Sequence, residues 1–179
     1  MTTLCEADRS ILLVIDPQAR LMPAIHDSAD VIQRCMQLAM AARELSIPVI
    51  GTEQNPEGLG PNVAELRTLC DRTVIKFHFA AVDEPGFVAS LPAGRTSFVV
   101  AGCEAHVCVL QTAIRLLETG HAVKWVVDAV GSRRVTDRDA ATARARICGA
   151  DVVTSEMVLF EWLRTSHHPS FRTVLKWLR

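Results

Sequence analysis

Short runs of apolar residues alternate along this chain with segments whose apolar residues recur every three or four positions. The runs are apolar at consecutive positions, as in residues 10–15, SILLVI, and residues 96–102, TSFVVAG. Strands of this kind are buried on both faces, which is typical of a parallel sheet covered by helices on both sides. The alternation therefore predicts a three-layer α/β/α fold with a six-stranded, mostly parallel, Rossmann-like sheet.

Six of the apolar runs have the length and composition of strands. They are residues 10–15, 48–52, 73–76, 96–102, 121–127 and 151–154. The first run stops at Asp16-Pro17, because proline has no N–H for a ladder and disfavours helical geometry in the residue before it. We therefore expect Asp16 to be extended and to close the first strand.

Segments with helical periodicity connect these strands. The first begins at an N-cap, Asp27 or Ser28, and has apolar residues three and four positions apart. This stripe consists of Val31, Cys35, Leu38, Ala42 and Leu45. A short helix is expected near residues 62–70, after the turn-rich loop EQNPEGLGPN.

Further helical segments follow the fourth strand. The first of them ends at Gly120 and is expected to bury an apolar stripe. This stripe consists of Val107, Leu110, Ile114 and Leu117. A capping-box-like pair, Thr136 and Asp139, predicts the start of the next helix, which closes at Gly149. Two C-terminal stretches are split by Pro169, and the last is expected to pack on the domain or on a partner subunit.

The length and the charge of the chain limit its function classes. With 179 residues, 49% of them apolar, it is expected to form one domain over residues 1–179. Its 19 basic and 20 acidic residues include no basic tract, so we expect no binding to nucleic acid. The first ten residues, MTTLCEADRS, lack a signal-peptide pattern. No apolar run approaches the roughly 18 residues of a membrane span. We expect a cytoplasmic protein with no membrane partner and six unpaired cysteines.

Three polar residues follow the carboxyl ends of the predicted strands. Asp16 closes the first strand, Lys76 closes the third, and Cys108 follows the fourth at the start of a helix. In a parallel α/β sheet these ends meet at one edge, beside the ligand crevice. A helix start and a nearby ammonium both favour a thiolate, and an aspartate can take up the thiol proton. The alternative is that Asp16 and Lys76 are surface or capping residues and that Cys108 is a small core residue.

Four segments resemble the isochorismatase-like cysteine hydrolase family. They are DPQARLM, TEQNPEGLGPNVAEL, the tripeptide Val74-Ile75-Lys76, and VVAGCEAHVCVLQTAIRLLETGH. The resemblance runs from about Ile11 to Ser155, and TEQNPEGLG and VVDAVGSR make it most similar to the small single-domain members. It implies that Asp16, Lys76 and Cys108 are the Asp-Lys-Cys triad of that family.

The resemblance also implies a particular backbone arrangement around the cysteine. A non-proline cis peptide is expected at Cys103-Glu104, and the N–H groups of Glu104 and Cys108 are expected to form an oxyanion hole. The implied reaction is attack by Cys108 on a carbonyl or imine-like carbon, loss of ammonia or an amine, and hydrolysis of the thioester by water held near Asp16.

The segment after the second strand departs from the metal-holding members of this family. Nicotinamide-hydrolysing members resemble one another in an Asp-x-His segment and a further His there, whereas this chain has Glu53-Gln54-Asn55. We therefore predict no metal and no cofactor, although Glu53 or Asn55 could face the pocket. The residues predicted to line the pocket are Gln18, Gln54, Asn55 and Phe79, with loop capping or packing as the alternative.

Two other cysteine-based sites are weaker interpretations. Cys103, His106 and Cys108 have residue types that zinc accepts, but their spacing is not the usual paired one. Cys103 and Cys108 could form a redox pair, but C-x4-C is not the C-x-x-C of thiol oxidoreductases.

The sequence as a whole predicts a cofactor-free cysteine hydrolase that acts on a small amide or related C–N substrate through a Cys108 thioester. One alternative is a non-catalytic oligomeric interaction protein with the same fold. Another is a hydrolase of the isochorismatase type acting on an enol ether. The high apolar share also predicts a homo-oligomer, a dimer or larger.

Overall fold

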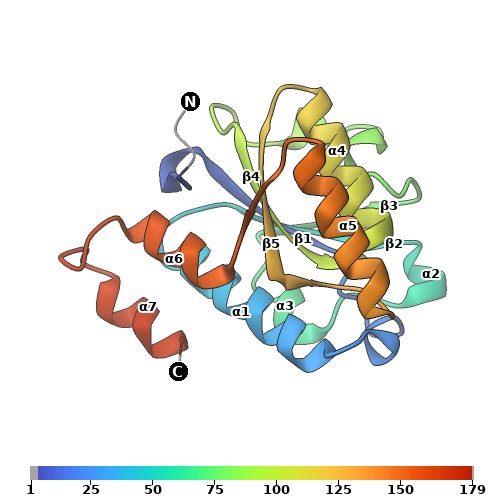
Figure 1. The fold of residues 1–179 in the computed structure, drawn as a ribbon, viewed down its shortest axis with the longest axis horizontal. Helices are drawn as coiled ribbons and strands as arrows, with labels where there is room; N and C mark the ends of the chain where they lie inside the picture. The colour runs from blue at the N-terminus through green and yellow to red at the C-terminus, as the bar shows by residue number, and fades with distance from the viewer. Residues whose placement is uncertain (1–3, 179) are drawn as a thin grey trace.

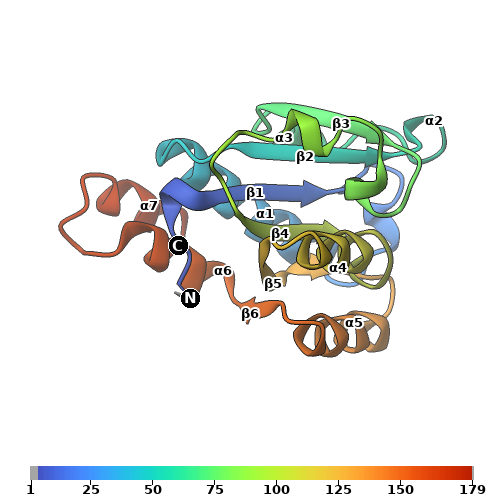
Figure 2. The same ribbon diagram turned by 90° about the horizontal axis from the view of Figure 1, so that it is seen from above.

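A six-stranded sheet, parallel throughout, forms the centre of the computed structural model, which describes residues 4–178. Its strands lie in the order β3-β2-β1-β4-β5-β6, visible in Figure 2. They are β1 (Ser10–Ile15), β2 (Val49–Gln54), β3 (Arg72–Lys76), β4 (Ser97–Cys103), β5 (Ala122–Gly131) and β6 (Asp151–Val153). The predicted α/β/α fold is confirmed, and the sheet is parallel at every pairing.

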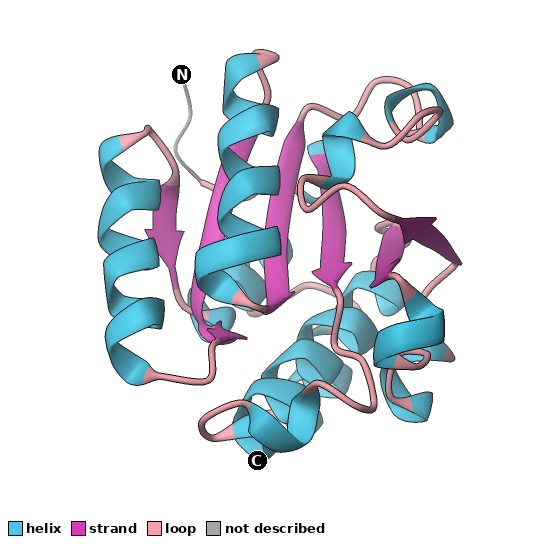
Figure 3. Ribbon diagram, turned by 90° about the vertical axis from the view of Figure 1, so that its right-hand side faces the viewer, coloured by secondary structure: helices cyan, strands magenta, loops and turns pink. Residues whose placement is uncertain are grey.

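Helices cover both faces of the sheet (Figures 1 and 3). They are α1 (Ser28–Glu44), α2 (Pro56–Leu59), α3 (Ala64–Arg67), α4 (Leu110–Glu118), α5 (Val135–Ile147), α6 (Ser155–Leu163) and α7 (Phe171–Trp177). The helices α1, α3 and α6 share one hydrophobic cluster with the sheet, and α4 and α5 share the other. No helix within residues 4–178 is long and apolar enough to cross a membrane.

The two clusters explain why β1 is apolar at consecutive positions. Leu12 and Val14 belong to the cluster on the α1 side, whereas Ile11, Leu13 and Ile15 belong to the cluster on the α4 side. Successive side chains of a strand point to opposite faces, so a strand with a helical layer on each side must be apolar throughout.

The buried face of α4 differs from the predicted one. The predicted Leu110 is buried together with Ala113 and Leu116, whereas the predicted Ile114 and Leu117 are only partly buried. A π-helical segment, Ala105–Val109, precedes α4. Its turn is wider than that of an α-helix. The periodicity of the residues before Val109 therefore does not continue in phase into the helix.

Two further boundaries differ from prediction. Helix α5 begins at Val135 with Arg134 as its N-cap, so Thr136 lies inside the helix and cannot cap its first turn. Strand β5 continues to Gly131, past the predicted end at residue 127, because it pairs with β4 again after a register shift. The extension carries the chain to the carboxyl edge of the sheet.

The C-terminal helix α7 packs on the domain, beside α1. Val174 is completely buried, and Phe171 and Trp177 are partly buried against the α1 cluster. The amide of Gln37 in α1 donates to the carbonyl of Trp177 over 2.6 Å. The apolar face expected for this segment is thus largely covered within the chain.

Candidate active site

The order of the strands reverses between β1 and β4. From β1 the chain goes to β2 and β3 on one side, then returns to β4 and continues to β5 and β6 on the other. The arrowheads of β1 and β2 end at the same edge in Figure 2. Ligands of such sheets bind beyond the carboxyl ends at this reversal. The three residues predicted to react, Asp16, Lys76 and Cys108, follow or close strands at this edge.

Strands β1 and β4 approach each other closely just before the site. Gly102 has a φ of +112° and lies opposite Ile15. A Cβ at this position would collide with the carbonyl of Ile15. Only glycine combines this backbone conformation with the space required, so Gly102 allows the ends of β1 and β4 to meet.

Asp16 is held by two strong contacts, one from β2 and one from β3. The Thr52 hydroxyl donates to its Oδ1 over 2.6 Å, and Lys76 Nζ lies 2.7 Å from its Oδ2. The residue is 1% exposed. Its φ is 48°, which corrects the expectation of an extended conformation. The left-handed region is accessible to aspartate at low cost, and here it places the carboxylate in these two contacts.

Lys76 is completely buried among oxygen atoms. Besides its contact with Asp16, Nζ donates to Gln54 Oε1 over 2.7 Å. It also donates to the carbonyls of His78 and Phe79 over 3.3 and 3.2 Å. An ammonium has three hydrogens, and four acceptors surround this one. The charge of Lys76 is therefore compensated within the protein.

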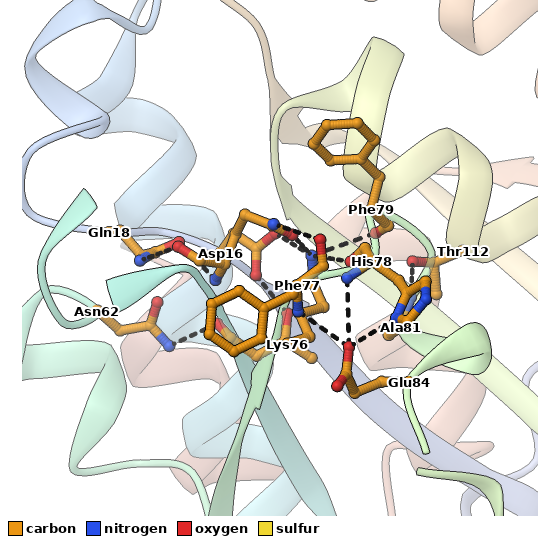
Figure 4. Close-up of polar contacts among 12 residues, drawn as sticks. Asp16, Gln18, Asn62, Lys76, Phe77, His78, Phe79, Ala81, Glu84 and Thr112 are labelled. Atoms are coloured by element: carbon orange, nitrogen blue, oxygen red, sulfur yellow. Dashed lines mark hydrogen bonds and ion pairs between the residues drawn. The ribbon is translucent and has the colours of Figure 1, made fainter. Parts of the chain in front are cut away.

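A short loop after β3 supplies two of those acceptors, and Glu84 holds it in shape (Figure 4). One carboxylate oxygen of Glu84 accepts from the N–H groups of Phe77 and His78 and contacts His78 Nδ1, over 2.9, 3.2 and 3.0 Å. These hydrogen bonds lower the pKa of Glu84, and the bond from Phe77 N–H contributes most. The N–H of Ala81 donates to the buried Thr112 hydroxyl of α4 over 3.0 Å.

Cys108 lies in the π-helical segment and is 6% exposed. Burial raises the pKa of its thiol to about 12, and the charge of Asp16 and a hydrogen bond to it act in the same direction. Lys76 lowers this pKa by less. The expectation of a thiolate is therefore corrected: desolvation and Asp16 outweigh the ammonium, so the thiol form of Cys108 is favoured.

The peptide bond between Cys103 and Glu104 is cis. The carbonyl of Glu104 accepts from the N–H groups of Val107 and Val109 over 3.1 and 3.2 Å, which starts the π-helical segment. Cys103 packs in the cluster on the α1 side of the sheet, whereas Cys108 packs in the cluster on the α4 side. The redox-pair interpretation is therefore not supported, because the two cysteines face opposite layers.

A cavity of about 390 Å³ opens beside Asp16 and Cys108. Two of the predicted pocket residues, Gln54 and Phe79, line it. The other described lining residues are Leu21, Ala24, Leu59, Glu104, Val107 and Arg133. Figure 4 shows Gln18 and Asn62 on the far side of Asp16 from Phe79.

Gln18 and Asn55 are not among the described residues that line this cavity. The Gln18 amide donates to the carbonyls of Gln54 and Gly60 over 3.0 and 2.6 Å and accepts from Gln54 N–H over 2.8 Å. Asn55 has a φ of 39°, and its N–H donates to the carbonyl of Lys76 over 3.0 Å. Both residues hold the loop after β2 in place. They therefore have the loop-capping role that was the alternative to lining the pocket.

Glu53 and His106 also have partners within the protein. The Glu53 carboxylate accepts from Asn62 N–H over 2.8 Å and lies 3.3 Å from the Arg67 guanidinium. His106 Nδ1 lies 3.0 Å from the Ser132 hydroxyl. Within residues 4–178, no group of three His, Cys, Asp or Glu side chains is arranged to hold a metal ion.

Three residues of the site were not predicted from the sequence: Thr52, Glu84 and Arg133. Arg133 lines the cavity, and its Nε donates to Glu104 Oε1 over 2.9 Å. A correct end for β5 would have placed Arg133 just beyond a strand, where ligand-binding residues are expected. Thr52 is the last residue of the predicted second strand, but no local pattern indicates that its hydroxyl reaches Asp16. Glu84 lies in a loop without a motif.

The chain is similar to known proteins over most of its length. The isochorismatase domain model matches residues 10–157. Isochorismatase domain-containing protein 2A of Mus musculus is 38% identical over 172 residues, which are 94% of this chain and 82% of that protein.

Two solved structures are similar over almost the whole chain. The protein described as MAR1 ribonuclease from Caenorhabditis elegans has a TM-score of 0.92 and 37% identity, covering 98% of this chain and 92% of that one. YcaC from Pseudomonas aeruginosa, solved with hexane-2,5-diol and covalent acrylamide, has a TM-score of 0.92 and 27% identity, covering 99% and 92%.

Proposed function

This chain belongs to the isochorismatase family, and on that basis we propose that it is a cofactor-free cysteine hydrolase of a small amide or related C–N substrate. The single observation that supports this most is the meeting of Asp16, Lys76 and Cys108 beside one cavity. Their chemical types supply a nucleophile, a proton acceptor and a fixed positive charge.

The first half of the proposed reaction forms a thioester. The Cys108 sulfur attacks the amide carbon while its proton passes to the Asp16 carboxylate. The carbonyl oxygen becomes an oxyanion, which the N–H groups of Glu104 and Cys108 stabilise. Asp16 then gives the proton to the leaving nitrogen, the C–N bond breaks, and ammonia or an amine departs.

The second half hydrolyses the thioester. Asp16 takes a proton from a water molecule, whose oxygen attacks the thioester carbon. The C–S bond breaks, a carboxylic acid is released, and the sulfur recovers its proton from Asp16. Every proton taken up is returned, so the cycle is balanced with water as the only co-substrate.

Lys76 makes the first proton transfer electrostatically possible. Before transfer the cluster holds Asp16 carboxylate, Lys76 ammonium and a neutral thiol. After transfer it holds a neutral Asp16, the same ammonium and a thiolate. The net charge of this buried cluster is unchanged, so no uncompensated charge has to be created away from water. This accounts for a reactive cysteine whose pKa at rest is about 12.

The test is a screen of small amides, ureas and carbamates for ammonia release. Wild-type protein is expected to release ammonia, whereas Cys108→Ala is expected to lose at least about a thousandfold in rate, as for other covalent nucleophiles. A Cys108-linked acyl group should be trapped by acid quenching and located by mass spectrometry. Ammonia release that persists in Cys108→Ala would contradict the proposed mechanism.

Assembly into a homo-oligomer of one-domain subunits in the cytoplasm is a second part of the proposal. It is supported by the exposed Ile75 and Phe77, which lie two residues apart on and directly after the edge strand β3. Large exposed apolar side chains on a sheet edge are typical of an interaction site. Light scattering of Phe77→Ser should show a smaller species than wild type, and an unchanged mass would argue against this surface.

The ribonuclease description belongs to the Caenorhabditis elegans protein, and we do not extend it to this chain. Its 19 basic residues are balanced by 20 acidic ones. At the cavity, Lys76 and Arg133 are both engaged by carboxylates. RNA binding relies on cations available to phosphates.

A further inference from the structure

The charged groups of the cavity are paired with one another, and its remaining wall is apolar. Resting on the proposed function, we propose that the substrate is an uncharged amide with a small apolar acyl group, and that amides carrying a carboxylate are rejected.

The wall that would contact the acyl group is made of hydrocarbon side chains. Five apolar residues line the cavity: Leu21, Ala24, Leu59, Phe79 and Val107. The volume of about 390 Å³ lies near the lower end of the range for small-molecule sites, roughly 300–1,000 Å³. A branched acyl chain of four or five carbons suits such a space better than an extended polar one.

The two cations near the cavity are already neutralised. Lys76 lies 2.7 Å from Asp16. Arg133 donates from both its backbone N–H and its Nε to one oxygen of Glu104, over 3.3 and 2.9 Å. A substrate carboxylate would have to share Arg133 with Glu104 while lying near a second carboxylate, Asp16. Because like charges repel most strongly away from water, this arrangement disfavours an anion.

The uncharged polar side chain of the wall is also occupied. Gln54 Oε1 accepts from Lys76 over 2.7 Å, and Gln54 Nε2 donates to the carbonyl of Phe77 over 2.8 Å. Its amide therefore has both ends engaged in holding the loop after β3. The polar side chains that remain available to the substrate are Cys108 and Asp16, where the amide group itself reacts.

Two amides of the same shape distinguish a cavity that prefers an apolar acyl group from one that accepts a carboxylate. Isovaleramide and malonamate have the same heavy-atom skeleton, with two methyl groups in the first where the second has carboxylate oxygens. We expect kcat/KM for isovaleramide to exceed that for malonamate by at least about a hundredfold, because the carboxylate would lie beside Asp16 and Glu104 with a cation that Glu104 already pairs. Acetamide should be slower than propionamide by about fourfold, the effect of one buried methylene.

Two variants test the role assigned to Arg133 and Glu104. The ratio of the malonamate rate to the isovaleramide rate should rise at least about tenfold in Glu104→Gln, because Arg133 is then free to pair with the substrate. The same ratio should stay within about twofold of wild type in Arg133→Gln. A wild-type preference for malonamate that disappears in Arg133→Gln would overturn the inference, since Arg133 would then be a carboxylate receptor.

A binding measurement separates failure of this inference from failure of the proposed function. Isovaleramide should slow alkylation of Cys108 by iodoacetamide, whereas malonamate should not, with the exposed Cys148 as internal control in the same digest. If neither amide is hydrolysed but isovaleramide alone protects Cys108, the cavity's selectivity stands and the hydrolase proposal fails. If malonamate protects better, or if neither amide protects, the substrate inference is wrong.

Discussion

Asp16 and Lys76 touch across 2.7 Å, yet different kinds of structure hold them. Asp16 follows β1, an inner strand that is buried at every position. Lys76 ends β3, an edge strand whose other residues are partly buried or exposed. The carboxylate is therefore positioned by the hydrophobic core and the ammonium by a polar loop. Core packing is stiff. Changes in the loop can therefore alter the reaction without unfolding the protein.

The largest effect is expected at the contact between Asp16, which the core positions, and Lys76, which the loop positions. Lys76→Met leaves the Asp16 carboxylate buried without its partner, so the free energy of unfolding should fall by about 3–5 kcal/mol and hydrolysis should be lost. Asp16→Asn combined with Lys76→Met should recover most of the stability but none of the activity. Urea denaturation and ammonia release measure the two properties. A stable Lys76→Met variant would show that the loop, rather than the ion pair, determines local stability.

The core side is tested next by Gly102→Ala. The new Cβ meets the Ile15 carbonyl at a positive φ, so the loss should exceed the roughly 1–3 kcal/mol typical of backbone strain alone. Gly120→Ala is the matched control, because Gly120 has a φ of +84° and no atom within 4 Å of the added Cβ. Equal losses in urea denaturation of the two variants would contradict the close approach of β1 and β4.

The loop side is tested by Glu84→Gln, which should alter catalysis and leave stability almost unchanged. Weaker hydrogen bonds to Phe77 and His78 N–H let the carbonyls around Lys76 shift, and we expect kcat to fall about tenfold with KM less affected. Asp83→Asn is the control, because Asp83 pairs with Arg115 and not with the loop backbone. A drop of the same size in Asp83→Asn would rule out a specific role for Glu84.

The pH dependence of Glu84→Gln sharpens this test. Hydrogen bonding lowers the pKa of Glu84 from an ordinary value of 4.5. A carboxylate with a lowered pKa supports the loop fully above pH 4.5, and this support is lost as the pH falls through the lowered value. The difference between wild type and Glu84→Gln should therefore be constant near neutrality and shrink below pH 4.5. A difference that persists in acid would show that the charge of Glu84 is not what matters.

Prediction from the sequence worked best on the core side of this comparison. The strand ending at Asp16 and the α1 stripe around Cys35 are encoded by apolar residues with a regular period, which local reading detects. Prediction was less successful where a side chain's partner is distant in sequence. Gln18 was expected to line the pocket, but it bonds the backbone of Gln54 and Gly60.

The protonation state of Cys108 could not be obtained from its position at a helix start. That position, and a nearby ammonium, suggested a thiolate. Its pKa depends instead on how deeply the sulfur is buried and on its distance from Asp16, and both act in the opposite direction. These are three-dimensional quantities. How deeply a residue beyond a strand end is buried depends on the loops that pack over it.

The layers of this fold and the reactive residue types at the carboxyl ends of the strands can be read from the amino-acid sequence alone. Burial on both faces requires uninterrupted apolar strands, and that requirement is written locally. The contacts of Glu84 with the loop around Lys76 and of Glu104 with Arg133 are visible only in three dimensions. The two contacts depend on where loops return to the sheet edge, which no period of the sequence encodes.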